Sequence, residues 1–239
     1  MKNKSKNRLQ AVKFESALTK NSIKSSNKRE SLKSKSLRSN KIRNIAYISI
    51  FSGISVMLYM FLKFKLPFFP PWLEVNLSML PIFLIIYLLG YKEALVVVVI
   101  RFLFKITSTE TAFIGETADI IIGLTTVLAS GLYFTKTEKN NKNLLISLVI
   151  GIIAWTIAGS LTNTFMLIPW YLTTYNLSLD NLASTLQYLY SGINGKNFML
   201  YYNLFGVIPF NIMLGSIVSI ITYIVAKRIN VVDIKTLHK

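Results

Sequence analysis

Several residues that common enzyme mechanisms require are missing from this 239-residue chain. It has no cysteine, which excludes disulfides, thiolate nucleophiles, Cys-ligated zinc and iron–sulfur clusters. The single histidine is His238, so no Ser-His-Asp triad, HExxH zinc site or histidine general base can form. No GxxxxGKS/T loop occurs, which excludes ATP hydrolysis by the P-loop route. We therefore expect a protein that is not an enzyme and that holds no cofactor and no metal.

Charge is also scarce and unevenly distributed. Charged residues make up 15% of the chain, against about 25% in soluble domains, and the mean hydropathy is +0.48. Residues 1–43 hold 14 of the 27 Lys and Arg and only two acids. We predict a basic, mainly disordered cytoplasmic tail over 1–43, attracted to anionic lipid, and a membrane domain over 44–239. The tail has one aromatic residue, Phe14, so no specific nucleic-acid partner is expected.

The membrane domain consists of hydrophobic blocks separated by short polar joints. A helix that spans a bilayer needs about 20 largely apolar residues. The blocks predict an all-α integral membrane protein of the cell membrane with six transmembrane helices. Their ranges are Ile45–Leu62, Val75–Leu89, Ala94–Phe104, Thr117–Phe134, Leu144–Leu172 and Asn197–Ala226. The second and third are short and are interpreted together as a helical hairpin.

The basic residues predict the orientation of these helices. All but five of the 27 Lys and Arg fall on one side if both termini are cytoplasmic, as the positive-inside rule requires. The three longest joints, about 63–76, 106–115 and 173–196, then lie outside. Long joints gathered on one side indicate that the outer face is functional.

Four charged residues are expected near the outer ends of the third and fourth helices. Arg101 and Lys105 are spaced i,i+4, and Glu116 and Asp119 are spaced i,i+3. Charges within a membrane are costly, so they face partners, water or substrate. Two interpretations are compatible: ion pairs that join the two helices, and direct contact with a polar ligand.

Polar and aromatic residues near the outer face are further candidates. Asn163 lies in an apolar run, where its amide can hydrogen-bond a neighbouring helix or the polar edge of a planar ligand ring. Trp170 and Tyr171 fit either an interfacial aromatic belt or stacking on a flat ligand. The last predicted helix carries Asn203 and Asn211, and Pro209 between them should kink it.

These residues carry a resemblance to a known family. Five motifs occur along the chain in this order: Pro67…Pro71-Trp72-Leu73-Glu74, Thr107-Ser108-Thr109, Gly115-Glu116-x-x-Asp119-x-x-x-Gly123, Asn163-x-Phe165-x-x-x-Pro169-x-Tyr171 and Pro209-Phe210-Asn211. Together they resemble the riboflavin-type substrate-binding (S) component of energy-coupling factor (ECF) transporters over about residues 45–226. Such a protein captures a vitamin near the outer face and has no ATPase of its own. The implied partners are the vitamin, a transmembrane coupling protein and two cytoplasmic ATPases.

The motifs and the four charged residues together give the expected binding residues. Ligand binding would fall to Trp72, Glu74, Arg101, Lys105, Thr109, Glu116, Asp119, Asn163, Tyr171 and Asn211. Docking on the coupling protein would fall to the small residues of the first helix, Ala46, Ser49 and Gly53. The joint that carries Trp72 and Glu74 is stiff and aromatic, and suits a lid or an interfacial anchor.

The chain departs from the family pattern in the ligand region. Leu214 stands where the riboflavin members usually have lysine, Asp119 where asparagine is typical, and Met79 near a common acid. The ligand could therefore be another vitamin or precursor. Two other classes of function stay open from the residues: an intramembrane hydrolase or lipid-modifying enzyme using Glu116 and Asp119, and a membrane scaffold with a recruiting basic tail.

Overall fold

The computed structural model describes residues 38–107, 109 and 113–237, with side chains to residue 229. The chain divides after Ala46 into two units. The expectation of a disordered tail over 1–43 falls mainly on residues 1–37, outside the described residues. The described residues begin with a helix, Arg38–Phe61, whose first residues belong to that predicted tail.

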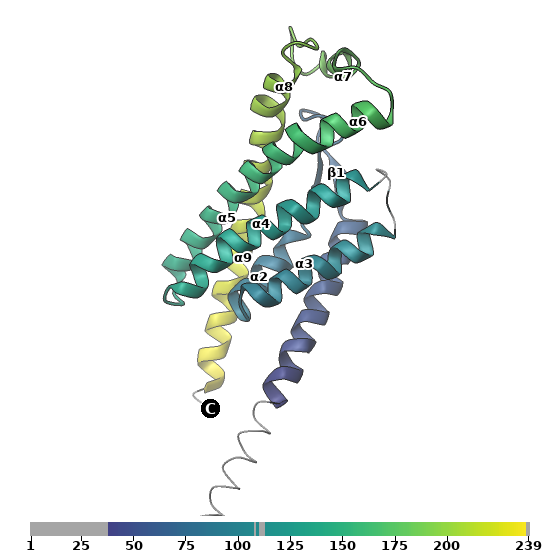
Figure 1. The fold of residues 1–239 in the computed structure, drawn as a ribbon. Coiled ribbons are helices and arrows are strands. Elements are labelled where there is room, and N and C mark those ends of the chain that lie inside the picture. Colours follow the sequence, from purple (N-terminus) through teal and green to yellow (C-terminus); the bar gives the residue numbers. More distant parts are fainter. Residues whose placement is uncertain (1–37, 108, 110–112, 238–239) are drawn as a thin grey trace, which may run out of the picture. The chain divides into compact units, whose positions relative to one another are not determined.

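The described chain is mostly helical (Figure 1). After the first helix come α2 (Met79–Leu88), α3 (Tyr91–Ile106) and α4 (Ile114–Lys136). One long helix follows, made of α5 (Asn141–Thr162), the π-helical segment η1 (Asn163–Leu167) and α6 (Ile168–Thr174). The short α7 (Leu179–Leu186) precedes a second long helix, made of α8 (Phe198–Tyr201), the π-helical η2 (Tyr202–Val207) and α9 (Ile208–Leu237).

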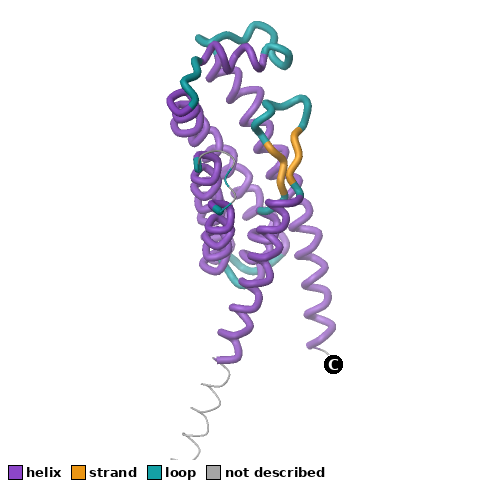
Figure 2. Tube along the Cα trace, turned by 90° about the vertical axis from the view of Figure 1, so that its right-hand side faces the viewer, coloured by secondary structure: helices purple, strands orange, loops and turns teal. Residues whose placement is uncertain are grey.

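A small β-hairpin interrupts the helices, which corrects the all-α expectation locally. Strands β1 (Lys63–Lys65) and β2 (Glu74–Asn76) pair antiparallel, with Lys65 opposite Glu74 (Figure 2). The helix expected from Val75 therefore begins only at Met79. The Asn76 side-chain oxygen accepts from the backbone N–H and the hydroxyl of Ser78, and this local turn ends the strand before the helix can start.

Among the described residues, four helices are long and apolar enough to cross a membrane: Arg38–Phe61, Ile114–Lys136, Asn141–Thr174 and Phe198–Ile229. The expected second helix is shorter, because the ten residues of α2 extend about 15 Å against a hydrocarbon core of about 30 Å. It is buried on all sides, with Ile82, Phe83 and Ile85 at most 1% exposed. The helix α2 is therefore a core element.

Close helix contacts hold the molecule together within Tyr47–Lys239. The helix α5 packs against α4 and α9, and α3 packs against α4. Between α4 and α5, the buried hydroxyls of Ser130 and Ser147 lie 2.9 Å apart and hydrogen-bond. Small and hydroxylated residues are typical of helix interfaces in membranes, because they let backbones approach and bond across.

Both long helices contain a π-helical turn directly before an Ile-Pro pair. The segment η1 precedes Ile168-Pro169, and η2 precedes Ile208-Pro209. Proline has no N–H to donate to the carbonyl one turn earlier, and a widened turn accommodates that loss. A π-helical turn thus lies where a kink is expected near Pro209, and a second π-helical turn lies near Pro169.

The longer joints gather at one end of the unit. In Figure 1 the hairpin, the end of α6, α7 and the start of α8 lie at the upper end, and the α4–α5 joint lies at the lower left. The joint after α6 is ordered by α7, where Ser178 and Asn181 form reciprocal cap hydrogen bonds. The first and last of the three long joints therefore lie at one end of the unit, and the side of the membrane that this end faces stays a prediction.

Candidate functional site

A cavity of about 450 Å³ lies within Tyr47–Lys239, and seven elements contribute to its wall. They are the end of the first helix, the hairpin with its loop, the end of α3, the start of α4, α5 with η1, α6 and α9. Its lining residues are Tyr59, Met60, Lys63, Lys65, Trp72, Leu73, Glu74, Asn76, Lys105, Gly115, Glu116, Ala118, Asp119, Ile122, Trp155, Asn163, Leu167, Tyr171, Phe210, Asn211 and Leu214. The volume lies within the range of small-molecule sites.

The structure brings together eight of the ten ligand-binding residues expected from the sequence. These are Trp72, Glu74, Lys105, Glu116, Asp119, Asn163, Tyr171 and Asn211. Arg101 is 1% exposed and lies behind the wall. Thr109 is not a lining residue, and its hydroxyl accepts from the backbone N–H of Phe113 at the start of α4. For Thr109 the structure therefore indicates a local turn contact.

Sequence reasoning missed several lining residues. Lys63 and Lys65 lie two apart in a strand, a spacing that places both side chains on one face, but the hairpin was not predicted. Tyr59 and Trp155 lie in apolar helices, where no local pattern distinguishes a lining position from a core position. Phe210 could have been found, because it lies between Pro209 and Asn211 in the family motif.

A buried charge cluster joins α3 to α4 beside the cavity. Arg101 donates to Oδ2 of Asp119 at 2.5 Å, and Lys105 Nζ lies 3.1 Å from the same oxygen. The side chains of Arg101 and Lys105 are 1% and 4% exposed, against 28% for Asp119. The ion-pair interpretation is confirmed for these three residues. Glu116 is 3% exposed in the first turn of α4, where the helix dipole favours an acid.

The cluster is tied to the hairpin and the first helix. Arg101 also donates to the Ser78 hydroxyl at 2.8 Å, and that hydroxyl donates to Asn76 at 2.6 Å. The Lys105 ammonium lies 3.8 Å from the centre of the Tyr59 ring, a cation–π geometry. Asp119, Ser78 and Tyr59 thus hold the two cations against this side of the cavity wall.

A second hydrogen-bonded chain crosses the cavity wall at the hairpin loop. Trp72 Nε1 donates to the Tyr202 hydroxyl at 2.9 Å, and that hydroxyl donates to Asn163 Oδ1 at 2.6 Å. The Asn163 amide nitrogen donates to the Gly159 carbonyl. Asn163 thus bonds a neighbouring helix, as one interpretation held, and also lines the cavity, where ligand contact stays a prediction.

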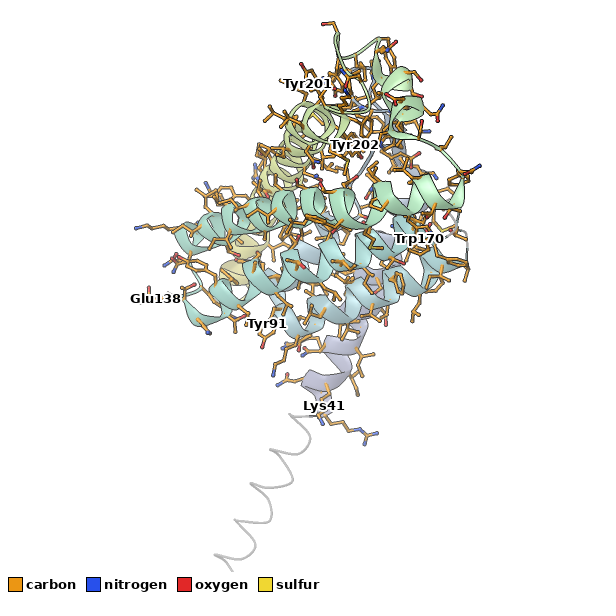
Figure 3. The ribbon with its side chains drawn as sticks, turned by 45° about the horizontal axis from the view of Figure 1, so that its top comes forward. Lys41, Tyr91, Glu138, Trp170, Tyr201 and Tyr202 are labelled. Carbon is orange, nitrogen blue, oxygen red and sulfur yellow. The ribbon has the colours of Figure 1, made fainter. Side chains whose placement is uncertain are left out.

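The remaining polar and aromatic candidates separate into two groups. Asn211 lines the cavity and donates to the Val207 carbonyl, whereas Asn203 bonds Ser160 and Thr164 across the helix interface. Tyr171 lines the cavity. Trp170 lies at the outer surface of α6 and is 38% exposed (Figure 3), as an interfacial aromatic residue would be.

A smaller apolar cavity of about 260 Å³ adjoins the first. The two share Trp72, Leu167 and Tyr171 as lining residues. At the open hairpin, Glu74 lies 3.9 Å from Lys63 and 3.7 Å from Lys65. These pairs are partly exposed and contribute about 0–1 kcal/mol each.

The fold and the site together define a class: a multi-pass helical membrane protein with a small-molecule cavity of charged, amide and aromatic groups. The model of the family "ECF transporter, substrate-specific component" matches residues 43–226. The chain belongs to this family, whose members are transport components and not enzymes.

Individual relatives agree with the family. The chain is 27% identical over 187 residues to the riboflavin transporter RibU of Staphylococcus aureus, covering 78% of this chain and 90% of the relative. It is 28% identical to the riboflavin transporter RibU of Streptococcus thermophilus, over 74% of this chain and 78% of the relative. It is 25% identical to the riboflavin transporter FmnP of Bacillus subtilis, over 76% of this chain and 88% of the relative. The solved structure of the S component of a bacterial ECF transporter has the same fold, with a TM-score of 0.62. It is 24% identical to this chain, and the match covers 80% of this chain and 96% of that structure.

Proposed function

We propose that the chain captures riboflavin or a closely related flavin at the outer face of the membrane and delivers it to a shared coupling module. The observation that carries the proposal is the cavity of about 450 Å³, in a family member whose relatives RibU and FmnP are named riboflavin transporters. The residues Trp72, Glu74, Arg101, Lys105, Thr109, Glu116, Asp119, Asn163, Tyr171 and Asn211 form the proposed binding set. Arg101 and Thr109 act through their neighbours.

The wall chemistry suits a flat ring with polar edges. Trp72, Trp155 and Tyr171 supply aromatic faces for stacking. Asn163 and Asn211 supply amides, which can both donate and accept, and Glu116 supplies acceptors for the hydroxyls of a ribityl chain. A few placed polar groups within an otherwise apolar pocket are the usual pattern of a small-molecule site.

Transport needs no covalent step in this chain. Differential affinity between a loaded, outward orientation and a docked, inward one is sufficient, with the free energy supplied by two partner ATPases. We propose that the four long helices together with the shorter α2 and α3 make up six helices within the membrane, with both termini cytoplasmic. We also propose docking on a transmembrane coupling protein through Ala46, Ser49 and Gly53. All three are exposed, and a Cβ at Gly53 would meet nothing within 4 Å, which leaves room for another helix to approach.

The direct test is ligand binding by the purified full-length protein. Mass spectrometry should find a flavin co-purifying with it, and quenching of flavin fluorescence should report one riboflavin per chain at or below micromolar concentration. Thiamine at the same concentration serves as the control and should not compete. If riboflavin, FMN and related flavins all fail to bind at micromolar concentration, the flavin assignment is wrong, and Leu214 is the first residue to examine. Chemical turnover of the ligand would favour an enzyme.

A further inference from the structure

The two oxygens of the Asp119 carboxylate have different surroundings. Arg101 and Lys105 both contact Oδ2. In the part of the chain that the structure describes, the contacts of Arg101 and Lys105 to this carboxylate run to Oδ2, and no hydrogen bond to Oδ1 is found. The side chain is 28% exposed and lines the cavity. One carboxylate oxygen is therefore held by protein cations, and the other is available to a ligand.

The cations that hold Oδ2 are themselves fixed. Arg101 is anchored by Ser78, and Lys105 lies against the Tyr59 ring. Gly123, one turn after Asp119, leaves room for the Arg101 side chain. A Cβ at this position would lie 3.3 Å from Arg101 Nη2 and 3.2 Å from Val98. The position of Asp119 is thus set by Arg101 from behind the wall and by Lys105 at the wall.

An ionised carboxylate oxygen can only accept a hydrogen bond, whereas an amide at the same place offers both a donor and an acceptor. A ligand group that faces Oδ1 must therefore carry an N–H or O–H. A carbonyl or a negative charge there would be left without a partner in a partly buried site, which is costly.

We propose that Asp119 Oδ1 is a specificity-determining acceptor that selects ligands carrying an N–H or O–H donor, and that Arg101 and Lys105 are positioning residues for it. This inference rests on the proposed function for its ligand. Riboflavin has two kinds of such donor, the imide N–H of the ring and the hydroxyls of the ribityl chain. The proposal names the shared donor chemistry, and the choice of analogues separates the two sources.

The test compares three flavins on the full-length protein: riboflavin, riboflavin methylated on the imide nitrogen, and lumiflavin, in which a methyl group replaces the ribityl chain. Because a hydrogen bond to a charged group contributes substantially to affinity, we expect the analogue that lacks the selected donor to bind about tenfold or more weakly than riboflavin. Loss with the imide-methylated flavin assigns the ring edge, and loss with lumiflavin assigns the ribityl chain. If riboflavin binds and neither analogue is weaker, the inference fails and the proposed function stands. If riboflavin itself does not bind, the proposed function fails.

Variants then test the role of the residues through the ratio of the two affinities, which a general loss of folding would not change. Asp119→Asn should lower the ratio between riboflavin and the discriminated analogue, because a neutral amide oxygen accepts a weaker bond. Lys105→Met should also lower it, since Asp119 loses one of its two anchors. Lys92→Met is the matched control, because it removes a lysine of the same helix at an exposed position outside the cavity lining, and it should leave the ratio unchanged. If Asp119→Asn leaves the ratio unchanged, Asp119 does not select the ligand. If Lys105→Met leaves the ratio unchanged, Lys105 does not position Asp119.

Discussion

The hydroxyl of Tyr202 donates to Asn163 Oδ1 at 2.6 Å and accepts from Trp72 Nε1 at 2.9 Å. It therefore links the hairpin loop to the π-helical segment η1. Tyr202→Phe removes both bonds and leaves a buried amide oxygen and an indole N–H without their partner, which should cost about 1–3 kcal/mol. We expect a lower melting temperature and weaker riboflavin binding, measured by thermal denaturation and flavin fluorescence. Tyr201→Phe is the control, since no hydrogen bond is described for the Tyr201 hydroxyl; equal effects of the two variants would contradict the linking role.

The interface between α5 and α9 predicts opposite outcomes for two glycines. A Cβ at Gly159 would lie 2.6 Å from the Asn211 amide nitrogen, whereas a Cβ at Gly215 would lie 3.4 Å or more from Ile152. Gly159→Ala must displace Asn211 from its place in the cavity wall, so riboflavin binding should weaken about tenfold. Gly215→Ala should leave binding unchanged and can stabilise the helix, because alanine is favoured over glycine by about 1 kcal/mol. Calorimetric titration of both variants checks this; unchanged affinity in Gly159→Ala would place Asn211 outside the ligand contacts.

Glu116 has both a local and a ligand-binding explanation, and one substitution separates them. Glu116→Gln keeps the shape and removes the charge. If Glu116 accepts hydrogen bonds from ligand hydroxyls, the affinity for riboflavin should fall about tenfold or more, with little change in the melting temperature of the ligand-free protein. Glu138→Gln, at an exposed position in the α4–α5 joint, controls for loss of negative charge. A fall in ligand-free stability at unchanged affinity would indicate a purely structural role.

Docking through the first helix should depend on small exposed side chains. Gly53→Leu fills the open space at that position and should prevent co-purification with the coupling protein while leaving riboflavin affinity unchanged. Thr125→Leu makes a similar enlargement on an exposed face of α4 and should retain the complex. Retention of the complex by Gly53→Leu would move the docking surface elsewhere.

The proposed topology can be tested with single cysteines, because the chain has none of its own. A membrane-impermeant thiol reagent should label Ser191→Cys in intact cells, since the joint after α6 is proposed to lie outside. Lys139→Cys, in the α4–α5 joint, should be labelled only after the membrane is opened. The reverse pattern would invert the orientation.

The sequence by itself determined the class of protein. Long apolar blocks predict membrane helices because no other element satisfies every backbone group in lipid, and the ordered motifs indicated the family. Motif residues such as Asn163, Tyr171 and Asn211 could be assigned to one site because they recur with the family pattern.

Only the tertiary structure decided how the remaining residues act. Side-chain type alone does not distinguish Arg101, buried behind Asp119, from Lys105, which reaches the wall, because that depends on how α3 packs on α4. The hairpin was missed for a related reason: Lys63–Lys65 and Glu74–Asn76 are three residues each, too short for a local pattern, and form strands only through pairing with each other. Local patterns determine which segments enter the membrane, whereas long-range packing determines which side chains meet at the cavity.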